Sequence, residues 1–372
     1  MRDSWKTVSI GDLCESISET YKGNDETVVL INTSDVLEGE VLNHTQVPNH
    51  RLKGQFKKTF RYQDILYSEI RPMNKRFAFV DFHNTNGYIA STKLMVLRSK
   101  SEKVLPEFLF DFLKSQPVVD ELQYMAEDRS ATFPQITFSG QVAPLRLMLP
   151  DLETQAKIIS FMRSIEDKIK INNTINKNLQ EQAITLFKQY CITENTNSTV
   201  LGNYCSFVKG KKPLALSDHA EKGYDLYLTI DVLTSSSKQY AISEKSVTAN
   251  AADILMVMDG ASSGSVLYGK SGVLGSTLAR IDVRDEFVRE IIRCFLIDLG
   301  DEIKKHNTGS AIPHADKKYI LQLPITIPTD YQVLGNILVS LRDKIITNKT
   351  ENERLSELRD ALLPKLMSGE ID

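Results

Sequence analysis

The chain carries one stretch twice, as LPDLETQAKIISFMRSIEDKIKINNTINKNLQEQ at residues 149–182 and as IPTDYQVLGNILVSLRDKIITNKTENERLSEL at residues 327–358. Self-similarity at a fixed separation decides the architecture of a chain. The two copies lie about 176–180 residues apart, far beyond the period of any solenoid repeat. We therefore expect two halves of one pseudo-symmetric molecule, each a globular part followed by a long helix.

Both copies contain mainly apolar residues at positions that step alternately by four and three. In the first copy these are Ile158, Met162, Ile165, Ile169, Asn172, Asn176, Leu179, Ala183 and Leu186. In the second copy they are Leu334, Leu338, Leu341, Ile345, Asn348, Asn352, Leu355, Arg359 and Leu362. This spacing predicts a coiled-coil seam along each helix. Asp151 is expected to cap the first helix.

Two asparagines lie near the middle of each seam, Asn172 and Asn176 in the first and Asn348 and Asn352 in the second. A buried asparagine costs stability unless its partner is also polar, so it penalises every misaligned register. Antiparallel and parallel pairing would both align them, and the equivalence of the two halves favours antiparallel. The alternative is a seam that opens to water at these positions. Helices of about 40 residues would form rods of about 55–60 Å, which could hold the two globular parts at a fixed distance.

The globular parts resemble each other only in outline. Asp64-Ile65-Leu66 matches Asp253-Ile254-Leu255, and Gly87 matches Gly272. A shared scaffold with divergent loops would produce this pattern. We expect four parts: residues 1–150, a helix over 151–192, residues 193–328, and a helix over 329–372.

Composition limits the class of protein. At 372 residues, with 41% hydrophobic and 25% charged residues, the chain is typical of soluble globular proteins. No apolar run is long enough to span a bilayer, and the first residues lack the apolar core of a signal peptide. The four cysteines form no CxxC pair, so no zinc or redox site is expected. A cytoplasmic location is the expectation.

The net charge of −3 and pI of about 6.1 disfavour a free-standing DNA-binding protein. Basic residues nevertheless gather locally. In the first half they are Arg51, Lys53, Lys57, Lys58, Arg61, Arg71, Lys75 and Arg76, and in the second half Lys209, Lys211, Lys212, Lys304, Lys305 and His306. Such clusters could bind phosphates; the alternative is ordinary solvated loop charge.

One stretch, residues 264–271, matches the phosphate-loop pattern GxxxxGK[ST]. That loop works at the start of a helix, where backbone amides surround the phosphates. The residues within and after this stretch instead indicate strand and turn, so ATP binding is not expected. The sequence contains no other catalytic constellation, which favours a protein that binds and positions over an enzyme.

The chain resembles the specificity (S) subunits of type I restriction–modification systems. The resemblance covers the whole chain. It is carried by the two repeated blocks with their Asp-Lys-Ile cores (Asp167-Lys168-Ile169 and Asp343-Lys344-Ile345), by the opening segment at residues 5–13, and by the ending LLPKLMSGEID at residues 362–372.

The resemblance implies an α+β fold in which two α/β target recognition domains are joined by two long helices that pair as an antiparallel coiled coil, with pseudo-two-fold symmetry. Each domain would read one half of a bipartite site on double-stranded DNA. The helices would also bind two modification (methyltransferase) subunits, which carry S-adenosylmethionine. A restriction subunit, which uses ATP and Mg, would join them. The chain itself would be non-catalytic and hold no cofactor or metal.

Base edges are read by polar side chains on loops, and phosphates by Lys and Arg. The candidate DNA contacts in the first half are Lys57, Lys58, Arg71, Asn74, Lys75, Arg76, Arg129 and Ser130. Those in the second half are Lys209, Lys211, Lys212, Ser262, Ser263, Lys304, Lys305, Ser310 and His314. Lys57 and Lys58 are expected to contact phosphates. A competing hypothesis is a coiled-coil adaptor that bridges protein partners without reading DNA.

Overall fold

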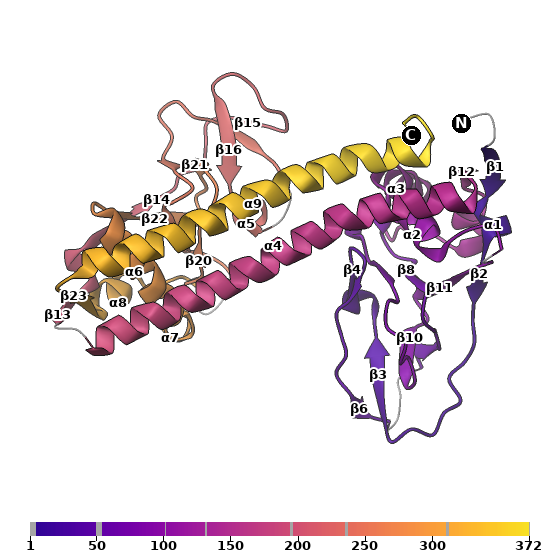
Figure 1. Ribbon diagram of the computed structural model, residues 1–372, viewed down its shortest axis with the longest axis horizontal. Coiled ribbons are helices and arrows are strands. Elements are labelled where there is room, and N and C mark those ends of the chain that lie inside the picture. The colour runs from indigo at the N-terminus through magenta and orange to yellow at the C-terminus, as the bar shows by residue number, and fades with distance from the viewer. Residues whose placement is uncertain are drawn as a thin grey trace. The chain divides into compact units, whose positions relative to one another are not determined.

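The computed structural model describes residues 5–49, 54–100, 102–130, 132–193, 196–234, 237–309 and 312–371 (Figure 1). Contacts divide the chain into two compact units, Met1–Glu166 with Glu357–Asp372 and Asp167–Ser356. Both units are α+β. Each contains part of the two long helices, α4 (Leu152–Thr193) and α9 (Tyr331–Met367).

The strands of the first unit form three main sheets. A two-stranded antiparallel sheet pairs β1 (Lys6–Ser9) with β12 (Arg146–Leu149). A four-stranded sheet has the order β2 (Cys14–Ile17), β11 (Leu94–Ser99), β8 (Ile65–Ser68) and β9 (Phe77–Phe79). Another has the order β6 (Val47–Pro48), β3 (Thr27–Ile31), β10 (Tyr88–Ser91) and β7 (Phe56–Lys58), in which β3 and β10 are parallel. A small hairpin joins β4 (Val36–Leu37) and β5 (Glu40–Val41).

The helices of the first unit follow the strands that they cover. They are α1 (Ile10–Leu13), α2 (Pro106–Lys114) and α3 (Gln116–Arg129), with short helical turns at Thr33–Asp35, Pro72–Asn74 and Phe138–Val142. Helix α2 begins with a proline, whose missing N–H costs nothing in a first turn. Its Phe108 and Leu109 are fully buried in the same core as Leu97 of β11. The unit is therefore built around the packing of α2 and α3 on the β2–β11–β8–β9 sheet.

The second unit repeats the three sheets. β13 (Thr196–Val200) pairs with β23 (Pro324–Pro328). A four-stranded sheet has the order β14 (Cys205–Lys209), β22 (Leu278–Val283), β19 (Ile254–Val257) and β20 (Val266–Leu267). A five-stranded sheet has the order β15 (Leu216–Ser217), β17 (Tyr240–Ile242), β16 (Tyr224–Leu228), β21 (Gly272–Leu274) and β18 (Thr248–Ala249), in which β16 and β21 are parallel. The helices are α5 (Ile230–Thr234), α6 (Glu286–Asp298), α7 (Gly300–Lys305) and α8 (Lys317–Gln322), with a helical turn at Leu201–Asn203.

The faint matches between the two halves mark equivalent positions in these sheets. Asp64 and Asp253 each precede a buried strand, β8 or β19, and each accepts a backbone hydrogen bond at 2.8 Å from the residue three positions earlier. Gly272 opens β21, where a Cβ atom would lie 2.0 Å from the carbonyl oxygen of Leu226. Only glycine allows the parallel strands to approach in this way. The predicted shared scaffold is confirmed for the two aspartates, whereas Gly87 lies in the turn before β10, with a φ of 74° and no such close approach.

Helices α4 and α9 run antiparallel within each unit. In the first unit, Ile158 and Met162, near the start of α4, share a core with Leu363 and Leu366, near the end of α9. In the second unit the order is reversed, because residues near the end of α4 share a core with residues near the start of α9. At the start of α4, Asp151 caps the helix as predicted: its Oδ1 accepts a hydrogen bond from the Thr154 N–H at 2.8 Å.

Buried charges attach a globular helix to a long helix in both units, with opposite polarity. In the first unit, Lys114 of α2 donates to Glu166 of α4 and to the buried Asp111, both at 2.7 Å. In the second unit, Arg342 of α9 donates to the buried Glu290 of α6 at 2.7 Å. Glu166 and Arg342 occupy the same position of the sequence repeat, just before the Asp-Lys-Ile core. A long helix thus supplies the anion of the ion pair in the first unit, Glu166, and the cation in the second unit, Arg342.

Candidate nucleic-acid interface

The loop between β8 and β9 carries the first group of predicted contacts. Arg71 and Lys75 flank the helical turn at residues 72–74, with φ angles of 44° and 52°. Left-handed backbone at residues other than glycine is uncommon, and such strain gathers at functional sites. The side chain of Arg71 is exposed and has no hydrogen bond or ion pair among the described residues. Asn74 is exposed as well.

The loop after α3 lies directly against this turn. The Arg71 N–H donates to the Pro134 carbonyl at 3.2 Å, and the Ile136 N–H donates to the Glu69 carbonyl at 2.9 Å. Phe133 is half exposed beside them. The structure therefore brings together two segments, around Arg71 and around Ser130, that the sequence places about 60 residues apart. Arg129 is exposed and donates to Gln141 Oε1 at 3.0 Å.

Other predicted cations of the first half already have contacts within the protein. Arg76 donates through Nη1 to the carbonyls of Ser34 and Val36, at 3.1 and 3.4 Å. Lys75 Nζ lies 3.8 Å from Glu38, in a surface ion pair. Arg76 thus supports the turn from beneath, while Arg71 and Asn74 face outward.

Lys58, the other expected phosphate contact beside Lys57, already has contacts within the protein. Its ammonium donates to the carbonyls of Thr92 and Leu94 at 3.1 and 2.8 Å, and burial lowers its pKa. The two carbonyl oxygens, one before β11 and one at its start, thus take two of the three N–H donors of the ammonium. Lys57 is exposed and has no ion-pair partner among the described residues.

The second unit contains an equivalent pair of loops. The loop after β19 meets the segment around Pro313, since the Gly260 N–H donates to the Pro313 carbonyl at 2.9 Å. Asp259 accepts hydrogen bonds from Lys209 Nζ at 3.0 Å and from His314 Nδ1 at 2.8 Å. Burial raises the pKa of Asp259, but the hydrogen bonds from His314 and Lys209 outweigh it and hold the pKa below its ordinary value. The Asp259 carboxylate therefore holds Lys209 and His314, two predicted DNA contacts, close together.

The side chain of Ser263, another predicted contact, is fully buried. Its hydroxyl donates to the carbonyls of Gly260 and Pro313, at 2.6 and 2.8 Å, and so joins the two loops. Ser262, next to it, is exposed. The remaining predicted contacts of this half are exposed as well: Lys211, Lys212, Lys304 and Lys305. Ser310 lies outside the described residues.

The asparagines of the long helices meet in pairs within the second unit. Asn172 Nδ2 donates to Asn352 Oδ1, and Asn348 Nδ2 donates to Asn176 Oδ1, both at 2.8 Å. Asn172 and Asn348 are 1% exposed. The sequence pattern missed a further partner, since Asn172 Nδ2 also lies 2.8 Å from Glu351 Oε2. The hydrogen bonds among these four asparagines, here called the asparagine layer, thus extend to the carboxylate of Glu351, which lies outside the seam.

The phosphate-loop pattern of residues 264–271 has a structural role. The stretch contains strand β20 and is followed by strand β21, so the prediction of strand and turn is confirmed. Lys270 donates to the Val232 carbonyl at 2.6 Å and forms an ion pair with Glu353 of α9 at 3.0 Å. Lys349 of α9 lies over the Tyr268 ring, 4.5 Å from its centroid. The stretch therefore docks against α9.

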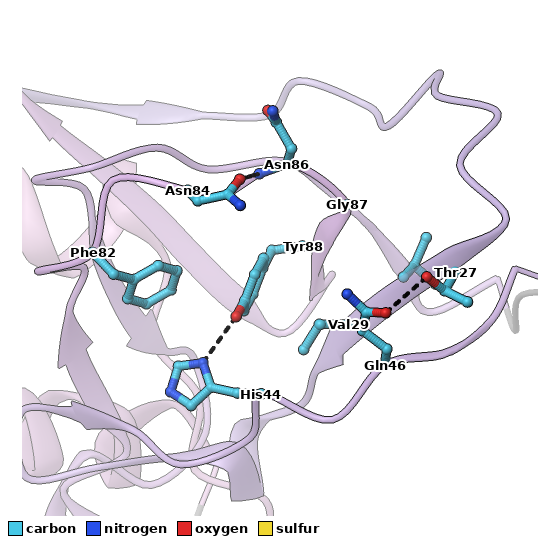
Figure 2. Close-up of a pocket in the computed structure, with 10 residues that line it drawn as sticks. Thr27, Val29, His44, Gln46, Phe82, Asn84, Asn86, Gly87 and Tyr88 are labelled. Atoms are coloured by element: carbon cyan, nitrogen blue, oxygen red, sulfur yellow. Dashed lines mark hydrogen bonds between the residues drawn. The ribbon is translucent and has the colours of Figure 1, made fainter.

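Sequence patterns also missed a cavity of about 310 Å³ in the first unit, beside the start of β3 and β10 (Figure 2). Its lining includes His44, Gln46, Asn84, Asn86 and Tyr88, which come from separate loops and one strand end. Asparagines and glutamines in loops carry no periodic signal, so only the matched glycine, Gly87, indicated this region.

The described residues contain no helix long and apolar enough to cross a membrane. They also contain no group of three or more His, Cys, Asp or Glu side chains arranged to hold a metal ion.

Comparison with known proteins gives a consistent result. The profile of the type I restriction modification DNA specificity domain matches residues 2–181 and 195–357. The specificity subunit of the type I restriction enzyme HindI from Haemophilus influenzae is 45% identical over 190 residues, which make up 50% of this chain and 41% of that protein. The MjaVIII specificity subunit from Methanocaldococcus jannaschii is 28% identical over 182 residues, 48% of this chain and 43% of that protein. The matched stretches thus span about two-fifths of these curated relatives.

A solved structure shares the fold. The crystal structure of the S subunit of a type I restriction–modification system from M. genitalium aligns with a TM-score of 0.54 and 15% identity, over 98% of this chain and 96% of that one. At this identity the likeness concerns the fold alone. The profile, by contrast, matches most of both halves. The chain belongs to the family of type I restriction–modification DNA specificity domains.

Proposed function

We propose that this chain is the sequence-specificity subunit of a type I restriction–modification complex, and that each unit reads one half of a bipartite site on double-stranded DNA. One observation supports this most: both units join the loop after an equivalent strand, β8 or β19, to a proline-containing segment. Exposed cations surround both junctions, while the scaffold beneath is shared. A common frame with two different loop sets suits an asymmetric, split site.

The proposed interface follows the sequence-based candidates, with changes. It consists of Lys57, Arg71, Asn74, Lys75, Arg129 and Ser130 in the first unit, and of Lys209, Lys211, Lys212, Ser262, Lys304, Lys305 and His314 in the second. Ser310 is retained from the sequence alone. Lys58 and Ser263 are omitted because their polar groups contact backbone carbonyls. Arg76 is assigned a supporting role for the same reason.

We propose that α4 and α9 set the spacing between the two half-sites and bind protein partners. Several large apolar side chains on these helices are exposed. On α4 they are Phe161 (45%), Ile171 (54%) and Ile175 (37%), and on α9 they are Val333 (46%), Ile337 (38%) and Leu358 (45%). Exposed apolar residues of this size suit a protein interface. By the family resemblance, the partners are two modification subunits and a restriction subunit.

The chain contributes recognition, and the proposed chemistry belongs to its partners. The modification subunits would supply S-adenosylmethionine for methyl transfer, and the restriction subunit would supply the ATP- and Mg-dependent activity. The near-neutral charge of this chain fits such an assembly, because partner subunits can provide much of the phosphate-binding surface.

Binding measurements on the reconstituted complex test the proposal. The chain is mixed with its cognate modification subunit, and affinities for a library of duplexes are measured over a salt series. Specific recognition predicts a site bound at least about 10³-fold more tightly than random duplex. Equal affinity for all sequences in the complex would contradict DNA readout and favour the coiled-coil adaptor.

A further inference from the structure

The cavity of the first unit has a chemistry unlike the cationic loops. It lies where β3 and β10 begin, and none of its lining residues is charged. Figure 2 shows Tyr88 at its centre, with Asn84 and Asn86 on one side and Gln46 on another. Phe82 lies beside Tyr88, with ring centroids 5.0 Å apart. The volume of the cavity, about 310 Å³, is at the small end of the range for ligand sites in proteins.

Hydrogen bonds within the cavity fix its histidine and its tyrosine. His44 Nε2 lies 3.1 Å from the Val41 carbonyl, which can only accept, so this nitrogen carries the proton. In the neutral imidazole, His44 Nδ1 then accepts from the Tyr88 hydroxyl, at 2.9 Å. Both ring nitrogens are therefore occupied, and the pair holds Tyr88 in place.

The side-chain amides of Gln46 and Asn84 also make hydrogen bonds within the protein, through their oxygen atoms. Gln46 Oε1 accepts from the Thr27 hydroxyl at 3.1 Å, and Asn84 Oδ1 accepts from the Asn86 N–H at 3.4 Å. The NH₂ groups of Gln46 and Asn84 have no hydrogen-bond partner among the described residues. Each carbonyl oxygen thus accepts one hydrogen bond inside the protein, while both NH₂ groups keep all their donors for a ligand.

A phosphate would not be the preferred occupant, because no Lys or Arg lines the cavity. Exposed Lys57 lies on β7, the strand paired with β10, and does not line the cavity. Uncharged donors beside aromatic rings match the edge of a nucleobase that presents acceptors. In the major groove these are guanine, through N7 and O6, and thymine, through O4.

We infer that this cavity is a base-reading site of the first unit, selective for guanine or thymine through Gln46 and Asn84. The inference rests on the proposed function and deepens it. It adds a site that carries base discrimination without charge, separate from the loops around Arg71.

Isosteric variants test the inference in the complex with the modification subunit. Gln46→Glu and Asn84→Asp each replace an NH₂ donor by an acceptor with almost no change in shape. At one or two base pairs of one half-site, the preference for guanine or thymine should fall by about 5–150-fold and move toward adenine or cytosine. Gln46→Ala and Asn84→Ala should lose the preference without reversing it.

Asn24→Asp provides the matched control, since Asn24 is exposed in the same unit and does not line the cavity. Asn24→Asp adds the same negative charge and should weaken binding to all DNA sequences equally. If the cavity variants behave like Asn24→Asp, or alter the other half-site, the inference is wrong. Thermal unfolding of each variant excludes loss of fold. Absence of any preference in the wild-type complex would instead contradict the proposed function.

Discussion

Individual cations that look alike in the sequence differ in what their charged groups contact. Arg71 is exposed and unpaired among the described residues, whereas Arg76 donates to two backbone carbonyls. Arg71→Ala should therefore reduce discrimination at one or two base pairs by about 1–3 kcal/mol if Arg71 reads bases. Arg76→Ala should mainly lower stability, by about 1–2 kcal/mol. Equilibrium binding to mismatched duplexes and thermal unfolding separate the two. Equal losses of specificity from both variants would contradict this assignment.

Lys349 should give the protein a pH-dependent stability in the alkaline range. Burial, together with the nearby Arg293 and Lys270, lowers its pKa to about 8 from 10.5. Between these values the unfolded chain binds the proton and the folded chain does not, so stability rises with pH. The full cost of the buried charge, at most about 3 kcal/mol, is present below pH 8.

Lys349→Met should remove this rise. Denaturant unfolding measures the difference in unfolding free energy between wild type and variant. From pH 8 to pH 10 the wild type should gain stability relative to Lys349→Met. Lys344→Met, at an exposed position of the same helix, is the control and should follow the wild type. Parallel curves for wild type and Lys349→Met would refute the assignment.

At the scale of elements, the asparagine layer should couple α4 to α9. Asn172→Leu removes the partner of Asn352 and one contact of Glu351, at an expected cost of about 1–3 kcal/mol. Asn172→Leu with Asn352→Leu should cost less than the sum of the single changes, because an apolar pair replaces a polar one. A double-mutant cycle by denaturant unfolding measures the coupling, with exposed Asn178→Leu as a control for helix propensity. Strict additivity would show that the pair does not interact.

The charged junction of the second unit makes a separate prediction. Arg342→Met removes the contact of buried Glu290 with α9 and leaves its ion pair with Arg293, so the expected loss is about 1–3 kcal/mol. Exposed Arg354 on the same helix is the matched control, and Arg354→Met should have little effect. Hydrogen exchange should show α6 loosened in the first variant only. Equal protection of α6 in both variants would mean that the ion pair does not hold the two helices together.

The sequence predicted the long helices well and the loop contacts only in part. Seams and caps depend on residues three or four positions apart, so the pattern of α4 and α9 is visible locally. Lys58 contacts carbonyls 34 and 36 residues away, and Ser263 contacts one 50 residues away. No local pattern reveals such contacts. The same holds for the cavity around Tyr88, which is assembled from separate loops.

The whole molecule combines a frame that recurs in both units with two different loop sets, the proposed readers of the two half-sites. Equivalent sheets, equivalent aspartates and the paired helices recur in both units, whereas the loops around Arg71 and Asp259 differ. Replacement of one reader should then leave the other unaffected, because each loop pair is held by hydrogen bonds within its own unit. Insertion of one heptad in each helix should lengthen the gap between half-sites.

The most direct test is to map modified bases across the genome of a host that expresses this chain with its modification subunit. The map is then repeated after residues 1–150 are replaced by the corresponding domain of a relative. The account predicts that one half of the bipartite site changes, while the other half and the spacing between them stay the same. A site that stays unchanged, or changes in both halves, would contradict the claim that each unit reads its own half-site.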